Sequence, residues 1–161
     1  MGRRVSLEEA AQVAERCRAQ GKRLVLANGC FDLLHVGHVR YLEDAKRLGD
    51  GLLGGLNSDA SASRLKGAGR PLMSQAERAE IVASLGCVDY VAIFDEDTAD
   101  RLITRIKPDI HAKGTDYAEE TVPEKESVRA VGGAVAIAGD AKTHSTSDLI
   151  ASIVRAFVAK A

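Results

Sequence analysis

Short apolar segments alternate with amphipathic segments along the whole chain, and this alternation restricts the fold more than any other feature of the sequence. Apolar runs of strand length occupy residues 23–27, 52–56, 88–94, 110–113 and 134–138. Between them, apolar residues recur at the three- and four-residue spacing of helices. Strands that alternate with helices form right-handed βαβ units and a mostly parallel sheet. The sequence therefore predicts a single α/β domain with five parallel strands and helices on both faces.

Capping residues, glycines and a proline mark the ends of the predicted helices. Ser6 and Glu9 form a capping box, and Ser74 with Glu77 forms a second one. We expect residues 1–20 to form an N-terminal amphipathic helix packed on a domain that spans residues 21–161. Further helices are predicted in residues 37–48, 57–65, 75–86, 97–107, 123–131 and 147–157.

Charge and cysteine content exclude several classes of protein. The 161 residues include 22 basic and 23 acidic ones, so the net charge of −1 creates no general attraction to nucleic acid or anionic lipid. The three cysteines form no C-x-x-C pair, which is typical of reduced thiols in the cytoplasm. No apolar run reaches the roughly 18 residues of a membrane span. We therefore expect a cytoplasmic protein, without membrane or nucleic-acid partners, that holds anionic ligands through local charges.

The stretch from Asn28 to His38 is the strongest candidate for a functional site. It follows the first predicted strand directly, and ligands of open α/β sheets bind beyond the carboxyl ends of the strands. His35 and His38 are three residues apart, with Gly37 between them, so both imidazoles lie on one face at the N-terminal end of the helix if it begins at or just before His35. Unpaired N–H groups and a partial positive charge at a helix N-terminus favour bound phosphate.

The pattern H-x-G-H alone is also compatible with two surface histidines or with half of a metal site. Two metal ligands on one helix are usually four residues apart, and no acidic third ligand is evident nearby, so we predict no metal ligands in the protein. The chain contains neither G-x-x-x-x-G-K-[ST] nor G-x-G-x-x-G, which disfavours P-loop and dinucleotide-binding enzymes. The pattern and its place in the predicted fold together favour a phosphate site.

Residues 29–38 resemble the H-x-G-H signature of the cytidylyltransferase-like nucleotidyltransferase superfamily. The resemblance covers nearly the whole chain, because segments similar to one branch follow in its order and spacing at residues 57–59, 64–67, 69–71, 77–78, 88–89, 94–98, 108–109, 113–117, 132–133 and 144–146. That branch comprises the heptose 1-phosphate adenylyltransferases, which occur alone or fused to a sugar kinase. A Rossmann-like sheet with the strand order 3-2-1-4-5 is then expected.

The resemblance implies that the nucleotidyl group of ATP is transferred to a sugar 1-phosphate, D-glycero-D-manno-heptose 1-phosphate, with release of pyrophosphate. The product would be ADP-heptose, a lipopolysaccharide precursor. Mg²⁺ would be bound with the triphosphate, and the implied partners include a sugar kinase and a second copy of the chain in a homodimer. Because a sugar phosphate is already ionised near neutral pH, its attack needs no general base, and positioning and charge neutralisation remain for the protein.

The residues that match signature positions of the family form three groups. The catalytic group comprises His35, His38, Lys66 and Arg78. The nucleotide-binding group comprises Asn28, Gly29, Cys30, Phe31, Asp32, Gly37, Lys113, Gly114, Asp116, Ser145 and Thr146. The substrate-binding group comprises Asn57, Asp59, Arg70 and Tyr117.

Several of these residues also have a purely structural interpretation. Lys66 and Arg70 could lie in a solvated charged turn, and Arg78 could form an ordinary ion pair along its helix. Asp32 is expected to orient the turn after the first strand. Residues 144–147 could cap the last helix and nothing more.

Three positions depart from the family pattern. Thr115 stands where a second glycine is usual, Ser147 stands where threonine is usual, and residues 122–124 are Val-Pro-Glu where many members have a Val-Val-Gly type of segment near the sugar site. The last departure bears on which acceptor is used. An alternative within the class is a CTP-dependent enzyme acting on glycerol 3-phosphate, and alternatives of other classes are a non-catalytic nucleotide-binding module and a metal hydrolase.

Overall fold

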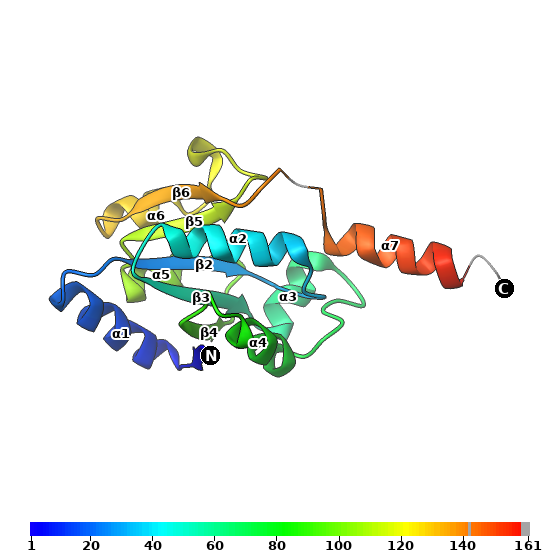
Figure 1. Cartoon of the computed structure of the whole chain (residues 1–161), viewed down its shortest axis with the longest axis horizontal. Helices are drawn as coiled ribbons and strands as arrows, with labels where there is room; N and C mark the ends of the chain where they lie inside the picture. The colour runs from blue at the N-terminus through cyan, green and yellow to red at the C-terminus, as the bar shows by residue number, and fades with distance from the viewer. Residues whose placement is uncertain (142, 159–161) are drawn as a thin grey trace.

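The computed structural model describes residues 1–141 and 143–158, and in this part of the chain six parallel strands form one sheet (Figure 1). The order across the sheet is β1-β4-β3-β2-β5-β6. The strands are β1 (Arg3–Arg4), β2 (Leu24–Gly29), β3 (Gly51–Asn57), β4 (Tyr90–Phe94), β5 (Ile110–Gly114) and β6 (Ala134–Ala138). The α/β class of the prediction is confirmed.

The prediction of five strands is wrong by one strand at the edge. The five predicted strands have the predicted order across the sheet. The additional strand β1 pairs with β4, with Arg3 opposite Tyr90 and Arg4 opposite Val91. The two residues of β1 are both arginines. A strand of this length has no alternation of apolar and polar residues from which it could be predicted.

Helices cover both faces of the sheet in the described residues (Figure 1). Both predicted capping boxes are present, with Ser6 and Ser74 as the N-caps of α1 and α4. The helices are α1 (Leu7–Ala19), α2 (Val36–Arg47), α3 (Asp59–Lys66), α4 (Gln75–Ser84), α5 (Asp100–Ile106), a 3₁₀ turn η1 (Glu119–Thr121), α6 (Lys125–Ala130) and α7 (Thr146–Phe157).

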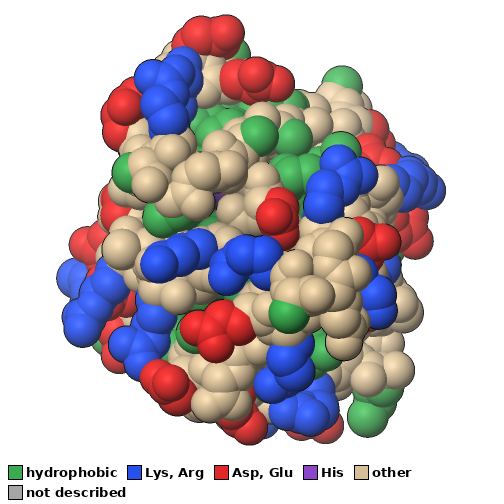
Figure 2. Space-filling view, turned by 90° about the vertical axis from the view of Figure 1, so that its left-hand side faces the viewer, with side chains coloured by type: hydrophobic (Ala, Val, Ile, Leu, Met, Phe, Trp, Pro, Cys, Tyr) green, Lys and Arg blue, Asp and Glu red, His purple; other side chains and the backbone are tan. Residues whose placement is uncertain are grey.

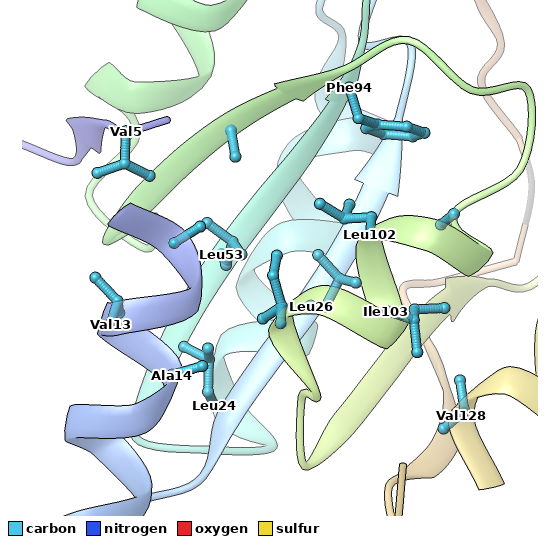
Figure 3. Packing of buried hydrophobic residues seen from close by; sticks show 14 residues of the cluster. Val5, Val13, Ala14, Leu24, Leu26, Leu53, Phe94, Leu102, Ile103 and Val128 are labelled. Carbon is cyan, nitrogen blue, oxygen red and sulfur yellow. The ribbon is translucent and has the colours of Figure 1, made fainter. Parts of the chain in front are cut away.

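The core consists of two apolar clusters, one on each face of the sheet. Val13 of α1, Leu26 of β2, Leu53 of β3 and Ile103 of α5 belong to the first cluster (Figure 3). The second cluster joins strand residues to α2 and α4 and includes Val25, Leu42, Leu52 and Val82. Helix α1 is thus part of the core of the domain. The predicted boundary at residue 20 stays a prediction, and residues 159–161 of the predicted domain lie outside the described residues.

Gly55 in β3 permits close packing between the sheet and α5. A Cβ atom at this position would lie 2.8 Å from Cδ2 of Leu102 and 3.3 Å from Cβ of Asn28. Gly55 therefore reflects a close approach of neighbouring side chains to the backbone of this strand.

Helix α7 extends away from the rest of the domain (Figure 1). None of its described residues is buried, and Phe157 is 77% exposed. At the opposite end of the molecule, basic and acidic side chains are interspersed over the surface (Figure 2). Within residues 1–141 and 143–158, the helices lack the combination of length and apolar character that crossing a bilayer requires.

Candidate active site

The carboxyl ends of the strands open into a cavity of about 630 Å³. Its walls come from the segments that follow β2, β3, β4, β5 and β6 and from the start of α7. This volume lies within the range of small-molecule sites in proteins. Of the predicted site residues, the cavity is lined by Asn28, Gly29, Cys30, Phe31, Asp32, His35, Gly37, His38, Asn57, Lys66, Arg70, Lys113, Gly114, Asp116, Tyr117, Ser145 and Thr146.

His35 and His38 cap the N-terminus of α2 reciprocally. Nδ1 of His35 accepts a hydrogen bond from the backbone N–H of Gly37 at 3.2 Å, and Nδ1 of His38 accepts one from the backbone N–H of His35 at 3.4 Å. The two rings are stacked with their centroids 3.9 Å apart. Because an Nδ1 atom that accepts a hydrogen bond carries no proton, the neutral rings carry their proton on Nε2. The pair therefore provides two N–H donors of defined tautomer.

Both histidines are neutral at pH 7 in this state. Burial lowers the pKa of His38 to about 4, with further contributions from His35 and Lys66. Burial also lowers the pKa of His35, and His144 adds to this effect. A bound polyphosphate would raise the pKa of both rings, because it favours their charged form.

Gly37 makes room for the first of these rings. A Cβ atom at residue 37 would lie 3.0 Å from the His35 ring and 3.5 Å from Cβ of His144. These distances leave little space for a side chain between the two histidines. Gly37 is needed because the His35 ring folds over its backbone.

An aromatic cluster supports the ring of His38. The edge of Phe31 contacts His38 at a centroid distance of 5.4 Å, and Phe31 stacks on Tyr41 at 6.4 Å. The hydroxyl of Tyr41 donates a hydrogen bond to the carbonyl of Ala112 in β5. Phe31 has a φ of 48°, which is rare for an aromatic residue and directs the chain sharply after β2.

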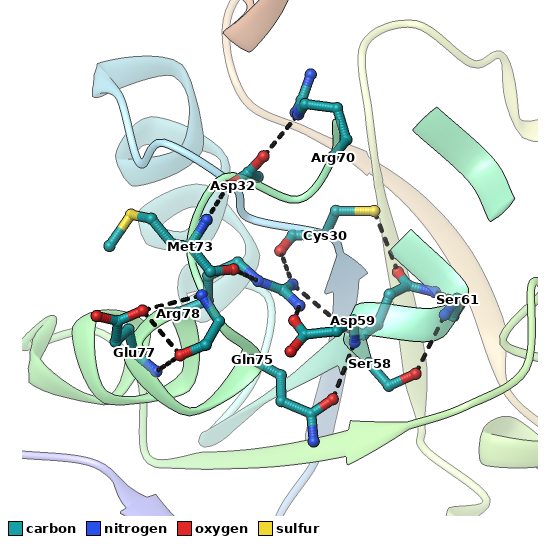
Figure 4. Close-up of polar contacts among 12 residues, drawn as sticks. Cys30, Asp32, Ser58, Asp59, Ser61, Arg70, Met73, Gln75, Glu77 and Arg78 are labelled. Carbon is teal, nitrogen blue, oxygen red and sulfur yellow. Dashed lines mark hydrogen bonds and ion pairs between the residues drawn. The ribbon is translucent and has the colours of Figure 1, made fainter. Parts of the chain in front are cut away.

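Asp32 ties the basic segment 66–73 to the turn after β2 (Figure 4). Its carboxylate accepts hydrogen bonds from Nε of Arg70 at 2.6 Å and from the backbone N–H groups of Leu72 and Met73. Burial acts to raise the pKa of Asp32, but these donors outweigh it and hold the pKa below its usual value. The expectation that Asp32 orients the turn is consistent with these contacts. Arg70 lines the cavity while its charge is paired with Asp32.

Arg78 corrects one of the predictions, because it is not among the residues that line the cavity. Its contacts are shown in Figure 4. Its side chain is fully buried. The guanidinium donates to the carbonyls of Met73, Cys30 and Asn57 and to the carboxylate of Asp59 at 2.8 Å. Each of its three nitrogen atoms thus donates a hydrogen bond within the protein. Direct contact of Arg78 with phosphates is contradicted by this geometry, and so is the alternative of an ion pair along its own helix.

Asp59 is the second predicted residue that the structure places outside the cavity lining. Its carboxylate accepts the hydrogen bond from Arg78 at the start of α3. Asp59 therefore helps to hold Arg78, and its predicted role in binding substrate stays a prediction.

The start of α7 contributes to the part of the cavity wall near His35 and His38, which is called the histidine end. Ser145 is the N-cap, and its hydroxyl accepts a hydrogen bond from the backbone N–H of Asp148 at 3.0 Å. The hydroxyl of Thr146 donates to the carbonyl of Asp32 at 2.8 Å. The helix end therefore reaches the turn after β2, and the two hydroxyls have structural partners.

Several cavity residues lie outside the predicted set. The additional lining residues include Tyr41, Leu65, Asp97, Thr98, Pro123, Glu124, Gly139, Asp140, Thr143 and His144. Tyr41 is one helical turn beyond His38, and Asp97 and Asp140 follow the ends of β4 and β6. The rule that ligands bind beyond the carboxyl ends of strands points to such positions. In the described residues, no group of three or more histidine, cysteine, aspartate or glutamate side chains could hold a metal ion.

The chain matches a known family model and known proteins. The model of the family described as cytidylyltransferase-like matches residues 26–157. The chain is similar to the bifunctional protein HldE of Geobacter metallireducens, with 52% identity over 94% of this chain and 31% of that protein. It is also similar to the bifunctional protein HldE of Syntrophotalea carbinolica, with 53% identity over 91% of this chain and 30% of that protein. The chain thus spans about a third of the length of these relatives.

A solved structure shares the fold. The crystal structure of the lipopolysaccharide core biosynthesis protein from Thermoplasma volcanium matches with a TM-score of 0.62 and 29% sequence identity. The match covers 73% of this chain and 94% of that chain. The family model covers most of the chain, and the fold agrees with that of a solved relative, so the chain belongs to the cytidylyltransferase-like family of nucleotidyltransferases.

Proposed function

We propose that the protein transfers the adenylyl group of ATP to D-glycero-D-manno-heptose 1-phosphate, releasing pyrophosphate and forming ADP-heptose. The observation that carries this proposal is the pair of Nε2–H donors, His35 and His38, at the N-terminus of α2 inside the cavity. The names of the similar proteins, bifunctional HldE and a lipopolysaccharide core biosynthesis protein, support a sugar-nucleotide product. The reaction would take place in the cytoplasm, where ATP is available.

In the proposed reaction, an oxygen of the sugar 1-phosphate attacks the α-phosphorus of ATP. A new P–O bond forms, and the bond to the bridging oxygen of pyrophosphate breaks, so the electron pair leaves with pyrophosphate. His35 and His38 donate to oxygens of the α- and β-phosphates, and Lys66 provides positive charge at the same end of the cavity. Donors that are positioned before the reaction stabilise charge as it shifts to the leaving group.

Mg²⁺ would enter as part of the MgATP substrate. The described residues contain no cluster of ligands for a resident ion, and Asp32, the carboxylate of the turn after β2, is paired with Arg70. Mg²⁺ commonly retains water ligands and binds to substrate phosphates in such enzymes. Its contribution would be to neutralise phosphate charge. A sugar kinase activity would supply the sugar 1-phosphate, and the predicted homodimer stays a prediction.

Release of pyrophosphate tests this function. The protein is incubated with each of the four nucleoside triphosphates, combined either with the heptose 1-phosphate or with glycerol 3-phosphate. We expect turnover with ATP and the heptose 1-phosphate. Turnover only with CTP and glycerol 3-phosphate would contradict the proposed substrates. Binding of ATP by calorimetry without turnover in any combination would instead indicate a nucleotide-binding module.

A further inference from the structure

A buried ion pair lies in the wall of the cavity that follows β5. Nζ of Lys113 lies 3.2 Å from Oε2 of Glu124 and 3.4 Å from Oε1. The side chains of Lys113 and Glu124 are only 9% and 4% exposed. Removing two charges from water is costly, and the loss of one partner leaves the other charge uncompensated. The pair therefore holds both side chains in one arrangement.

Glu124 also connects this wall to helix α5. Its Oε1 accepts a hydrogen bond from the backbone N–H of Ala99 at 3.3 Å, and Ala99 is an N-cap without a side-chain acceptor of its own. Oε2 has no hydrogen bond of good geometry, so its contact with Lys113 is electrostatic. The carboxylate thus joins the end of β5, the start of α5 and the residue that precedes α6.

Lys113 in turn contacts a residue that is accessible from the cavity. Its ammonium lies 4.8 Å from the centroid of the Tyr117 ring, and Tyr117 is 37% exposed. An ammonium group over an aromatic face is attracted by the ring and orients it. Glu124 thus contacts Lys113, and Lys113 contacts the ring of Tyr117, which lines the cavity.

The charge of this wall differs from that of the histidine end. Lys66 and the capped start of α2 lie at the histidine end, whereas the charge of Lys113 is compensated by Glu124. A compensated, hydrogen-bonding wall next to an aromatic ring suits an uncharged sugar ring with hydroxyl groups. It offers little attraction to a further phosphate, because the positive charge of Lys113 is neutralised by Glu124.

We propose that Glu124 is a positioning residue that holds Lys113 and Tyr117 so that they bind the hydroxyl-bearing sugar ring of a ligand whose phosphates lie at His35 and His38. This inference rests on the proposed function, in which each of the two ligands contains a sugar ring that carries phosphate. The ring could be the ribose of the nucleotide or the ring of the sugar 1-phosphate, and the experiment distinguishes these two sources.

The test is Glu124→Gln, which keeps the shape of the side chain and the acceptor for Ala99 but removes the charge. Calorimetry with ATP and with the heptose 1-phosphate is combined with steady-state kinetics. We expect a roughly tenfold loss of affinity for one of the two ligands, a matching rise in its KM, and a kcat within about threefold of the wild type. The ligand that is affected identifies the ring. Glu126→Gln, two residues away with a side chain 80% exposed, is the matched control and should leave both affinities unchanged.

Two further variants separate positioning from folding. Lys113→Met should weaken the same ligand, and the double variant should be no weaker than the weaker single variant, because both changes disrupt one unit. Tyr117→Leu alters a partly exposed residue and should weaken the binding of that ligand even if Glu124→Gln fails to fold.

Affinities within twofold of the wild type in all folded variants, or additive losses in the double variant, would overturn the proposal. Wild-type protein that binds ATP without releasing pyrophosphate would contradict the proposed function, while the binding test of Glu124 could still be completed.

Discussion

The two histidines of the H-x-G-H segment act through the direction of their hydrogen bonds. Each Nδ1 atom is occupied by a backbone N–H group of the first helical turn, so each Nε2–H group remains for a ligand. Two histidines spaced by three residues predict a shared helical face if the helix begins at or just before His35. In the structure α2 begins at Val36, and His35 precedes it as an N-cap with extended backbone. The reciprocal capping and the neutral state depend on the ring orientations and on burial, which spacing does not determine.

His38→Ala should lower kcat by about 10² to 10³, the range for the loss of one preorganised donor. The measurement is the initial rate of pyrophosphate release at saturating concentrations of both substrates. Arg47→Ala, at the other end of the same helix with a side chain 70% exposed, is the control and should leave kcat unchanged. A loss of less than threefold for His38→Ala would exclude the proposed role.

The buried histidines also predict how stability depends on pH. Burial lowers the pKa of His38 and of His111 to about 4, below the ordinary value of 6.5. Between these values the unfolded chain binds protons that the folded chain excludes, so the free energy of unfolding falls as the pH falls. Each histidine contributes a slope of ~1.4 kcal/mol per pH unit within this window.

Denaturant unfolding from about pH 7 to about pH 5 measures this slope. His111→Gln removes one of the two groups and should make the dependence on pH shallower. His111 lies beneath the cavity, with Nε2 2.8 Å from Oδ1 of Asn28. An identical slope in the variant and the wild type would contradict the assignment.

At the scale of secondary-structure elements, Arg78 connects three segments of the chain through hydrogen bonds. Its donors reach the turn after β2, the end of β3 and the segment before α4. The sequence contains a signal for this position, because Arg78 lies four residues before the buried Val82 and therefore on the inward face of α4. An arginine on a buried face indicates a residue that satisfies backbone carbonyls.

Arg78→Met should destabilise the protein by about 3 kcal/mol or more, because it leaves buried carbonyls and Asp59 without their donor. Denaturant unfolding gives this value. Arg101→Ala removes an arginine that is 81% exposed and paired with Glu96, and it should change stability by less than about 0.5 kcal/mol. A large fall in kcat at unchanged stability would show that Arg78 acts on the phosphates directly.

The elements themselves were largely predictable, and the reasons are local. Capping boxes at Ser6 and Ser74 and the run of apolar residues in β2 are signals contained within a few residues. Strand β1 has no such signal, because it exists only through its pairing with β4. Helix α7 exposes the apolar residues Leu149, Ile153, Val154 and Phe157. Their exposure could not be predicted, because amphipathic periodicity does not indicate whether another element covers the apolar face.

At the scale of the whole molecule, the parallel sheet explains why distant segments form one cavity. Asn28, Asn57 and Lys113 stand at the carboxyl ends of three neighbouring strands, so the topology brings them to one edge. This half of the site follows from the predicted strand order. The wall with Glu124 and Asp140 does not, because the positions of long connecting segments depend on tertiary contacts such as those of Glu124 with Lys113 and Ala99.

The central claim is that an oxygen of the sugar 1-phosphate attacks the α-phosphorus of ATP. The most direct measurement is the mass of both products after the wild-type protein reacts with ATP and a sugar 1-phosphate labelled with ¹⁸O in its phosphate group. The label should appear entirely in the nucleotide sugar, and the pyrophosphate should be unlabelled. Labelled pyrophosphate, or formation of AMP with the labelled sugar phosphate unchanged, would contradict the account.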